Sequence, residues 1–476
     1  MRPAHLAPAT LPLLVVAALA LSGCAVARKP DLRLPVAFEG PAAPPAGAIA
    51  LDSWWTAYGD AELTGLVEQA LARNPDVRTA RSRLDEVKAQ RISAIAQYLP
   101  QGDPTYSSRR THTDQLGGTV VSIPGFSNSG TSTNQAANFN VSWEVDPFGR
   151  GFFAGRAATA EVARVRYAYE NTRASIAAQT ADAWFQAKGF AIQLADARET
   201  ARIEQDLYDV ATKRAKAGIA ATSDADRIAG DLAQANAQVE GLQAQLQVEK
   251  RAILILAGRV VEPTANINST PDVGQPPAVP PSLPSDLLQR RPDVRGAQAA
   301  LRSQKNQKII DALALFPSFN FTPGIGWQKV KQPGFSSTSQ NWVLGGSITQ
   351  PLLSIPRLLA EWKAQDARTE QAVTAYEKTV QTAFQEAESA LVNLDADRRR
   401  VVILTDGEAR ARRGYAAARI GYDRGFNDLS TTLQAEQSWR AVRAQLTAAQ
   451  VQALRRSVQA YKAIGGGWPA QTYAAK

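Results

Sequence analysis

Two stretches of the chain alternate between apolar and polar residues. Residues 139–145 read Phe-Asn-Val-Ser-Trp-Glu-Val, and in residues 318–327 apolar side chains take nearly every odd position. A period of two is that of a β-strand, and aromatic residues on one face of a strand of about ten residues are typical of a transmembrane β-barrel. We therefore predict β-hairpins in 101–147 and 317–351, with lipid on one face and water on the other. An amphipathic strand of a soluble sheet is the alternative.

The loops of these two hairpins are expected to differ in length. Gly, Ser, Thr and Asn are frequent in residues 111–135, and a shorter stretch of this kind covers 331–340. Such composition suits solvent-exposed loops. His112 falls within the first loop, and we assign it no role. The strand over 104–110 is the least regular, because two consecutive arginines interrupt its alternation.

Two long stretches without proline have a different composition. Residues 148–262 and 357–468 contain no Pro and are rich in Ala, Gln, Glu, Arg and Leu, which favour helices. One Gly near the middle of each is a plausible break, so we predict helical hairpins over 148–262 and 356–466. The first arm, 150–216, would be about 100 Å long. Helices of this length need a coiled-coil or barrel-like neighbour, and a coiled coil without a channel is the alternative.

The chain contains an internal duplication. Leu-Ala-Arg-Asn-Pro-Asp-Val at 71–77 recurs as Leu-Gln-Arg-Arg-Pro-Asp-Val at 288–294, and a helical stretch follows each copy. Seven prolines between Pro263 and Pro284 predict a linker between the repeats. The predicted segments are a signal peptide (1–23), a lipid anchor and N-terminal segment (24–70), a first repeat (71–262), a Pro-rich linker (263–284), a second repeat (285–468) and a C-terminal tail (469–476).

Short local signals mark the ends of several elements. Asn74 followed by Pro75 is an N-cap with Pro at the first helical position, whereas Arg291 is a poor cap in the second copy. Gly149 permits the turn from a strand into the first long helix, and the Gly run 465–467 stops the last helix. The remaining aromatic candidates are interpreted as packing or interface residues: Trp54, Trp55 and Trp468.

The N-terminus has the features of a secretion signal. Arg2 precedes an apolar run over 11–21, which is too short to span a bilayer, and Leu-Ser-Gly-Cys follows at 21–24. This order resembles the bacterial lipoprotein signal, in which the Cys is lipidated after cleavage. An ordinary signal peptide is the alternative. Ala25 does not resemble the Asp that retains many lipoproteins at the inner membrane, so we expect acylation of Cys24 and an outer-membrane address.

Composition excludes several classes of site. The chain has one Cys, one Met and two His, so it can form neither a disulfide framework nor a Cys/His zinc site, and we expect no metal site and no cofactor. We find no P-loop and no Gly-x-Ser-x-Gly motif, and expect no enzyme activity. The net charge is +9, but a secreted chain is not expected to bind nucleic acid. The arginine runs 398–400 and 412–413 are interpreted as solvated helix faces.

The predicted strands are too few to form a barrel from one chain. Open sheet edges are not tolerated in lipid, and four strands cannot close on themselves. The chain must therefore oligomerise. Two copies would supply eight strands and three copies twelve, and both remain open at this point.

Several motifs in order resemble the TolC-type outer-membrane efflux protein family, and specifically its lipidated, NodT-like branch. Besides the repeated motif and the lipoprotein signal, they are Trp-Glu-Val-Asp-Pro-Phe-Gly-Arg at 143–150 and Ala-Tyr-Lys-Ala-Ile-Gly-Gly-Gly-Trp at 460–468. The resemblance implies a mainly α fold with a membrane β-barrel, in which three chains form a twelve-stranded barrel on a long periplasmic α-barrel.

The same resemblance implies a function. The chain would be the passive outer-membrane channel of a tripartite drug efflux system, opened by a periplasmic adaptor and powered by an inner-membrane transporter of the RND type. The alternatives are a lipid-anchored periplasmic coiled-coil scaffold and the channel of a type I secretion system. A scaffold does not need lipid-facing strands.

The resemblance also places the functional residues at the tips of the helical hairpins. The expected adaptor contacts are Gly218, Thr222, Ser223, Gly425, Asn427 and Ser430. The second tip departs from the family pattern, because three residues separate Phe426 from Ser430. The expected gate residues are Asp423, then Tyr422, Asp224 and Asp226. In a symmetric oligomer, copies of Asp423 would crowd the axis, and a ring of carboxylates selects cations or pairs with Arg in a closed state.

Overall fold

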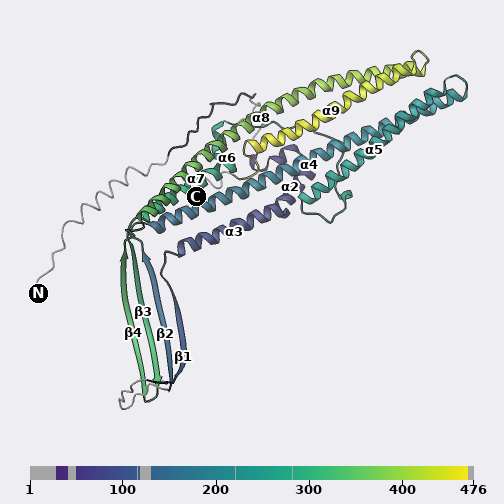
Figure 1. Ribbon diagram of the computed structural model, residues 1–476. Coiled ribbons are helices and arrows are strands. Elements are labelled where there is room, and N and C mark those ends of the chain that lie inside the picture. The colour runs from purple at the N-terminus through teal and green to yellow at the C-terminus, as the bar shows by residue number, and fades with distance from the viewer. Residues whose placement is uncertain are drawn as a thin grey trace. The chain divides into compact units, whose positions relative to one another are not determined.

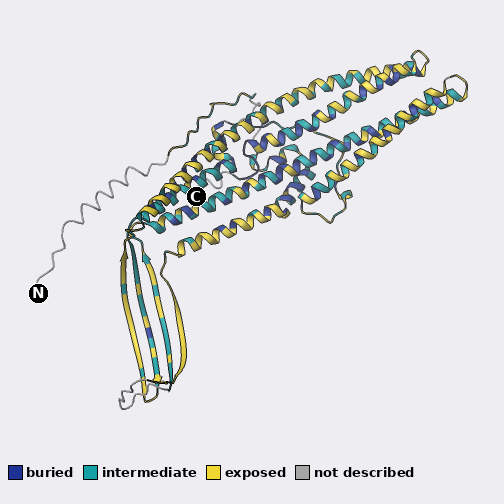
Figure 2. Cartoon of the chain, viewed as in Figure 1, coloured by how far each residue is buried: buried dark blue, intermediate teal, exposed yellow. Residues whose placement is uncertain are grey.

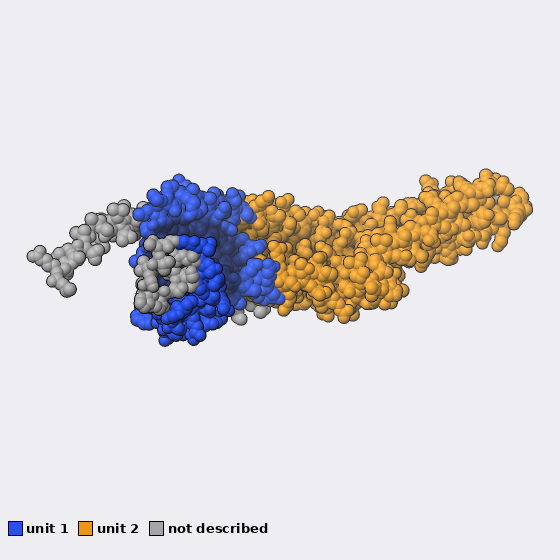
Figure 3. All heavy atoms as spheres, turned by 60° about the horizontal axis from the view of Figure 1, so that its bottom comes forward, with its two compact units in different colours: residues 1–30, 85–164, 298–375 blue, residues 31–84, 165–297, 376–476 orange. Residues whose placement is uncertain are grey.

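The computed structural model of the chain describes most of its residues (Figure 1). The described residues are 28–40, 50–114, 116–117, 130–219, 221–280, 282 and 284–469. The expected signal peptide and Cys24 lie outside them, as does the expected C-terminal tail beyond its first residue. The chain divides into two compact units, which Figure 3 shows in different colours. Unit 1 comprises residues 1–30, 85–164 and 298–375, and unit 2 comprises residues 31–84, 165–297 and 376–476.

Among the described residues of unit 1, four strands form one antiparallel sheet in the order β1-β2-β3-β4. They are β1 (Gln101–Thr113), β2 (Gly130–Val145), β3 (Ser318–Gln332) and β4 (Phe335–Thr349). Pairing of β2 with β3 joins the hairpins of the two repeats into a single sheet. Strands β1 and β4 are therefore its edges, and β1 is exposed along its whole length (Figure 2).

Both loops are shorter than the sequence predicts. β1 continues to Thr113 and β2 begins at Gly130, so much of the stretch expected as a loop is strand. β3 and β4 are joined by Pro333 and Gly334 alone, and Gly334 has a φ of 80°, so Pro followed by Gly is the residue pattern of a type II turn.

His112 was expected in the first loop, and this expectation is wrong. It lies in β1, where its Nδ1 is 3.0 Å from Thr131 Oγ1 and its Nε2 is 3.2 Å from Asp114 Oδ1. The polar composition of this end of the hairpin concealed the strand, because nearly every residue there suits a loop as well.

The register separates the sheet into an apolar face and a polar face. Residues directly opposite each other on antiparallel strands point to the same side of the sheet. The apolar face carries the rows Val145–Phe319–Ile348, Trp143–Phe321–Gly346, Pro104–Phe139–Ile325–Trp342 and Tyr106–Ala137–Trp327–Gln340. The polar face carries the rows Glu144–Asn320–Ser347, Asp103–Asn140–Gly324–Val343 and Thr105–Asn138–Gly326–Asn341. The predicted alternation over 139–145 and 318–327 is confirmed.

The helices include the two long hairpins expected from the proline-free stretches. α4 (Arg150–Lys216) and α5 (Thr222–Leu256) form the first, and α8 (Ile355–Asp423) and α9 (Leu429–Ala463) form the second. The other helical elements are η1 (Leu51–Tyr58), α2 (Ala61–Arg73), α3 (Pro75–Ala96), η2 (Thr264–Asn266), η3 (Pro284–Asp286), α6 (Leu287–Arg290) and α7 (Pro292–Leu313). No helix within the described residues has an apolar stretch long enough to cross a membrane.

The core of unit 2 is built around the segment that precedes the first repeat. Trp54 of η1 is fully buried and stacks on Tyr461 of α9, with ring centroids 5.6 Å apart. Asp60 caps α2 by accepting hydrogen bonds from the backbone N–H groups of Glu62 and Leu63. Its other oxygen accepts from Trp184 Nε1 at 2.9 Å and from the Lys188 ammonium at 3.0 Å. Residues 51–73 therefore form part of the folded core.

The two copies of the repeated motif are anchored by different chemistry. Asn74 Oδ1 accepts a hydrogen bond from the backbone N–H of Asp76 at 2.8 Å, as expected of an N-cap. Arg291 caps nothing: its guanidinium is buried, contacts Asp293 and Glu386 at 2.6 Å each, and donates to the carbonyl of Ala463 at 3.1 Å. In the second copy, one cation therefore connects α7, α8 and α9.

Buried aromatic and basic residues connect the Pro-rich linker and the chain end to the helices. Trp468 is buried, and its Nε1 donates to the carbonyl of Arg290 at 2.8 Å, so it is a packing residue within the chain. Arg398 was expected on a solvated face, but its guanidinium donates to the carbonyl of Pro277 at 2.8 Å. Arg399 and Arg400 are exposed, as expected.

An N-terminal strap, residues 31–40, lies against α8. Backbone N–H groups hold it there: that of Asp31 donates to Glu377 at 2.7 Å, and those of Glu39 and Gly40 donate to Glu388. The ring of Phe38 stacks on Phe384 at 5.7 Å. The strap thus lies along one face of α8, the first arm of the second helical hairpin.

Candidate functional site: the hairpin tips and the charges above them

The tip between α4 and α5 is a tight turn built on Gly218. This residue has a φ of 74°, a left-handed conformation that favours glycine. The backbone N–H of Gly218 donates to Ala215, and that of Ile219 donates to Arg214, both at 3.0 Å. This pattern satisfies the last carbonyls of the helix. It leaves the Ile219 side chain 77% exposed at the end of the hairpin.

The tip between α8 and α9 is also a tight turn built on a glycine. Gly425 has a φ of 77°, and the backbone N–H of Phe426 donates to Gly421 at 2.7 Å. Phe426 is 82% exposed. The Asp428 side chain caps α9 by accepting from the backbone N–H of Thr431 at 2.7 Å. This tip therefore has a side-chain cap for the following helix, which the tip between α4 and α5 lacks.

The expected adaptor contacts fall into two groups in the structure. Thr222, Ser223 and Ser430 are exposed in the first turns of α5 and α9. Asn427 instead builds the tip: its side-chain amide donates to the carbonyl of Ala418 at 3.3 Å and covers Gly421, where a Cβ would collide with it. Sequence reasoning missed Ile219 and Phe426, although each directly follows the turn glycine and could have been found from its apolar character there.

The gate candidates are placed in different surroundings. Asp423 is 57% exposed, and its Oδ1 lies 3.4 Å from Arg419 Nε one turn earlier on α8. Tyr422 is buried, and the guanidinium of Arg214 lies over its ring at 4.8 Å. Asp226 is exposed and Asp224 is half-buried on α5. Within the described contacts, Tyr422 rather than Asp423 connects the second hairpin to the first.

A buried charge cluster lies further along the hairpins, formed by Glu204 of α4 with Glu436 and Arg440 of α9. Both glutamates are fully buried. The Arg440 guanidinium contacts Glu204 Oε1 at 2.8 Å and Glu436 Oε1 at 3.7 Å. Glu204 Oε2 and both oxygens of Glu436 have no hydrogen-bond partner among the described residues. One cation therefore serves two buried carboxyl groups.

Burial changes the titration of this cluster. The pKa of Glu436 is raised to about 7: loss of water is the largest cause, Arg440 opposes it, and the nearby Glu204 adds to the rise. Burial also raises the pKa of Glu204, with Arg440 acting in the opposite direction. Arg419 and Asp231 act on Glu436 as well, from α8 and α5. Sequence reasoning missed this cluster, since Glu204 is more than 200 residues from Arg440 along the chain.

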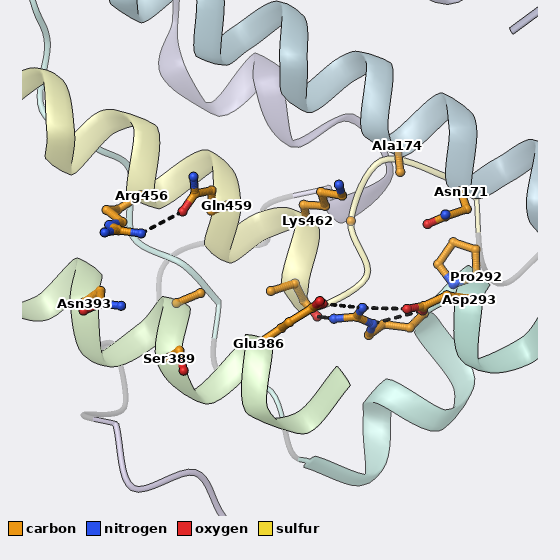
Figure 4. Close-up of a pocket in the computed structure, with 14 residues that line it drawn as sticks. Asn171, Ala174, Pro292, Asp293, Glu386, Ser389, Asn393, Arg456, Gln459 and Lys462 are labelled. Atoms are coloured by element: carbon orange, nitrogen blue, oxygen red, sulfur yellow. Dashed lines mark hydrogen bonds and ion pairs between the residues drawn. The ribbon is translucent and has the colours of Figure 1, made fainter. Parts of the chain in front are cut away.

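A polar cavity of about 320 Å³ is lined in part by Arg291 (Figure 4). Asp293 and Glu386 lie against its guanidinium, and Arg456 and Lys462 lie on the α9 side. The two carboxylates already neutralise Arg291, so the cavity is not a simple anion site. In the part of the chain that the structure describes, no group of three His, Cys, Asp or Glu residues is arranged to hold a metal ion.

Comparison with known proteins identifies the family. The family model described as outer membrane efflux protein matches residues 66–259 and 283–466, which are the two copies of the duplication. This chain belongs to that family. It is an efflux channel of the outer membrane, with its helical hairpins in the periplasm.

The similarity to individual relatives covers nearly the whole length of the chain. The chain is 28% identical to the antibiotic efflux pump outer membrane protein ArpC of Pseudomonas putida, over 96% of each chain. It is 25% identical to nodulation protein T of Rhizobium leguminosarum, over 98% of this chain and 94% of that protein. Among solved structures, the outer-membrane channel OprN has the same fold, with a TM-score of 0.80, 24% identity, and coverage of 94% of this chain and 100% of that one.

Proposed function

We propose that three copies of the chain form one continuous passive conduit from the periplasm to the exterior. The observation that carries this proposal is the open sheet. Strands β1 and β4 are both edges, and an unpaired edge cannot face lipid. Pairing β4 of one copy with β1 of the next satisfies both edges, and three copies give the twelve-stranded barrel of the family. The polar face would then line the conduit and the apolar face would contact lipid.

The mass of the purified assembly tests this proposal. Light scattering in detergent, corrected for bound detergent, should give about three times the mass of the mature chain, and single-channel recording in planar bilayers should show conductance. A stable folded monomer would contradict both the closed barrel and the conduit. A lipid-anchored scaffold would give no conductance.

We further propose that the hairpin tips receive a periplasmic adaptor, which connects the channel to an inner-membrane transporter of the RND type. The exposed apolar side chains of Ile219 and Phe426 support this role, because exposed apolar residues at the end of a polar hairpin mark a contact surface. Opening at the tips would admit cargo, for which we propose drugs or other small molecules. A type I secretion channel would instead carry polypeptide, and transport of a small fluorescent drug separates the two.

The N-terminal signal supports a second attachment to the membrane through acylation of Cys24. Labelling of growing cells with a fatty-acid probe should mark the wild type and leave Cys24→Ala unmarked. Equal labelling of both would exclude lipidation at this residue. The strands hold the chain in the membrane in either case, so Cys24→Ala should remain in the outer-membrane fraction.

A further inference from the structure

The apolar face of the sheet changes character toward the turn at Pro333 and Gly334. From the row of Val145 to the row of Trp327 it is apolar and aromatic, as described above. The next two rows on the same face are Ser108–Gln135–Lys329–Thr338 and Arg110–Thr133–Lys331–Ser336. They hold three cations and no apolar residue. We call Arg110, Lys329 and Lys331 the basic band.

The height of the basic band along the strands matches the edge of a membrane. The apolar rows from Val145 to Ala137 span nine residues of β2, or about 27 Å along the strand. Strands of such barrels are tilted by about 35–45°, so this length covers about 20 Å of membrane height. The next row, that of Lys329, then lies at the edge of an apolar belt of the usual height, roughly 25 Å. Tyr106 and Trp327 form the last of these rows and suit an aromatic girdle. Lys329 and Lys331 lie about 7 and 13 Å beyond Trp327 along β3.

The orientation of the chain assigns this edge to the outer leaflet. α4 follows β2 and α8 follows β4, so the helices connect to the opposite end of the sheet from the turn (Figure 1). Because the helices are periplasmic, the turn end faces the exterior.

The cations of the basic band have no carboxylate partner in the described part of the chain. Arg110 and Lys331 are exposed and Lys329 is partly exposed. The nearest acidic residue along the strand, Asp114, is already 3.2 Å from His112. Lys329 and Lys331 are neighbours on one face of β3, and Arg110 lies two strands away in the row of Lys331, about 10 Å across the sheet. Long side chains at these spacings can converge on one or two phosphate groups.

We infer that the basic band binds the phosphorylated glycolipid of the outer leaflet through its lipid A phosphates. Charge complementarity and position favour this ligand. Lys and Arg are the side chains that recognise phosphate, and here they adjoin a surface that contacts acyl chains. The inference rests on the proposed barrel, since the apolar face must contact lipid. Arg109, one residue away in β1, belongs to the polar face and would point into the conduit.

Native mass spectrometry of the full chain in detergent, titrated with bisphosphorylated lipid A, tests the inference. The wild-type assembly should bind lipid A, and the triple variant Arg110→Gln, Lys329→Gln, Lys331→Gln should bind it at least tenfold more weakly. Replacement by the other cation, Arg110→Lys with Lys329→Arg and Lys331→Arg, should keep binding within about threefold. Arg109→Gln is the matched control, which removes the same charge at the same height from the other face, and should not change binding.

Phosphatidylglycerol serves as the second probe, because it offers a phosphate without the glycolipid. Its binding should be weaker, and the triple variant should reduce it less than it reduces the binding of lipid A. Unchanged lipid A binding by the triple variant, an equal loss in Arg109→Gln, or an equal dependence of phosphatidylglycerol on the band would each overturn the inference. If the triple variant does not assemble, Lys331→Gln alone should still weaken lipid A binding severalfold. The same spectra give the oligomeric state. A wild-type trimer that does not bind lipid A would refute the glycolipid site, whereas a monomeric wild type would refute the proposed channel.

Discussion

Arg440 on α9 donates a hydrogen bond of 2.8 Å to Glu204 on α4, and so joins the hairpin of the second repeat to that of the first. Glu204 is buried, and Glu436, one turn from Arg440, lies 3.7 Å from the same guanidinium. A single positive charge thus compensates two carboxyl groups that water does not reach. The packing of the two hairpins against each other must depend on how many of these groups are ionised.

The first prediction concerns pH. Between about pH 4.5 and pH 7 the folded chain holds a proton on Glu436 that the unfolded chain has released, because its pKa is raised from 4.5 to about 7. The bound proton therefore stabilises the folded chain, and this contribution to the free energy of unfolding is fully present below pH 4.5 and is lost as the pH rises through 7. It amounts to about 3 kcal/mol. The melting temperature in detergent should therefore fall from pH 5 to pH 8 more steeply for the wild type than for Glu436→Gln. Parallel pH profiles of the two proteins would contradict the assignment.

The second prediction concerns the shared cation. Arg440→Leu leaves both glutamates buried without a counter-charge, and breaking a buried pair in this way costs about 3–5 kcal/mol. The melting temperature should drop sharply, and most of the loss should be recovered when Glu204→Gln and Glu436→Gln are added. A triple variant as unstable as Arg440→Leu alone would show that packing, and not charge, accounts for the effect.

The third prediction concerns the cap that connects the N-terminal segment to the core. Asp60→Ala removes the cap of α2 and leaves the Trp184 indole N–H without its acceptor, at an expected cost of about 2–4 kcal/mol. Asp428→Ala removes an exposed cap with a single hydrogen bond to Thr431 and should cost only about 1 kcal/mol. Thermal melting of both variants compares them directly. Equal losses would mean that the contacts of Asp60 to α4 contribute nothing.

The fourth prediction concerns the gate. If copies of Asp423 meet near the axis of the trimer, Asp423→Ala should raise the resting conductance or lower the preference for cations while the assembly stays intact. Asp406→Ala is the matched control: Asp406 is 64% exposed and pairs with Arg410 at 2.7 Å one turn away on the same helix. Planar-bilayer recording should distinguish the two variants. If both leave conductance and selectivity unchanged, the constriction must be sought at Tyr422, Asp224 or Asp226.

The sequence predicted the regular elements best where one signal repeats many times. The long helices follow from stretches without proline, and their ends follow from Gly218 and Gly425, whose positive φ values no other residue type adopts as easily. It predicted β1 only in part, as an irregular strand over 104–110, because the residues of β1 are mostly polar on both faces. Only the register against β2 shows that Arg110, and not Arg109, lies on the apolar face.

The candidate site was predictable in its local parts only. A glycine turn is encoded by neighbouring residues, so both tips could be placed. The cluster of Glu204, Glu436 and Arg440 depends on how two distant helices pack, and a buried glutamate in a long helix has the same sequence context as a solvated one. The contacts of Asp60 with Trp184 and Lys188 were missed for the same reason, since these partners on α4 are more than 120 residues away.

The strap over residues 31–40 is held mainly by its backbone, and this has a consequence for how freely it can mutate. The N–H groups that reach Glu377 and Glu388 exist in every residue except proline. Most side chains of the strap are therefore interchangeable, and the information that positions it resides in α8. Random mutagenesis of the strap should give a tolerant segment with sharp intolerance of proline at positions 31, 39 and 40, and of small residues in place of Phe38.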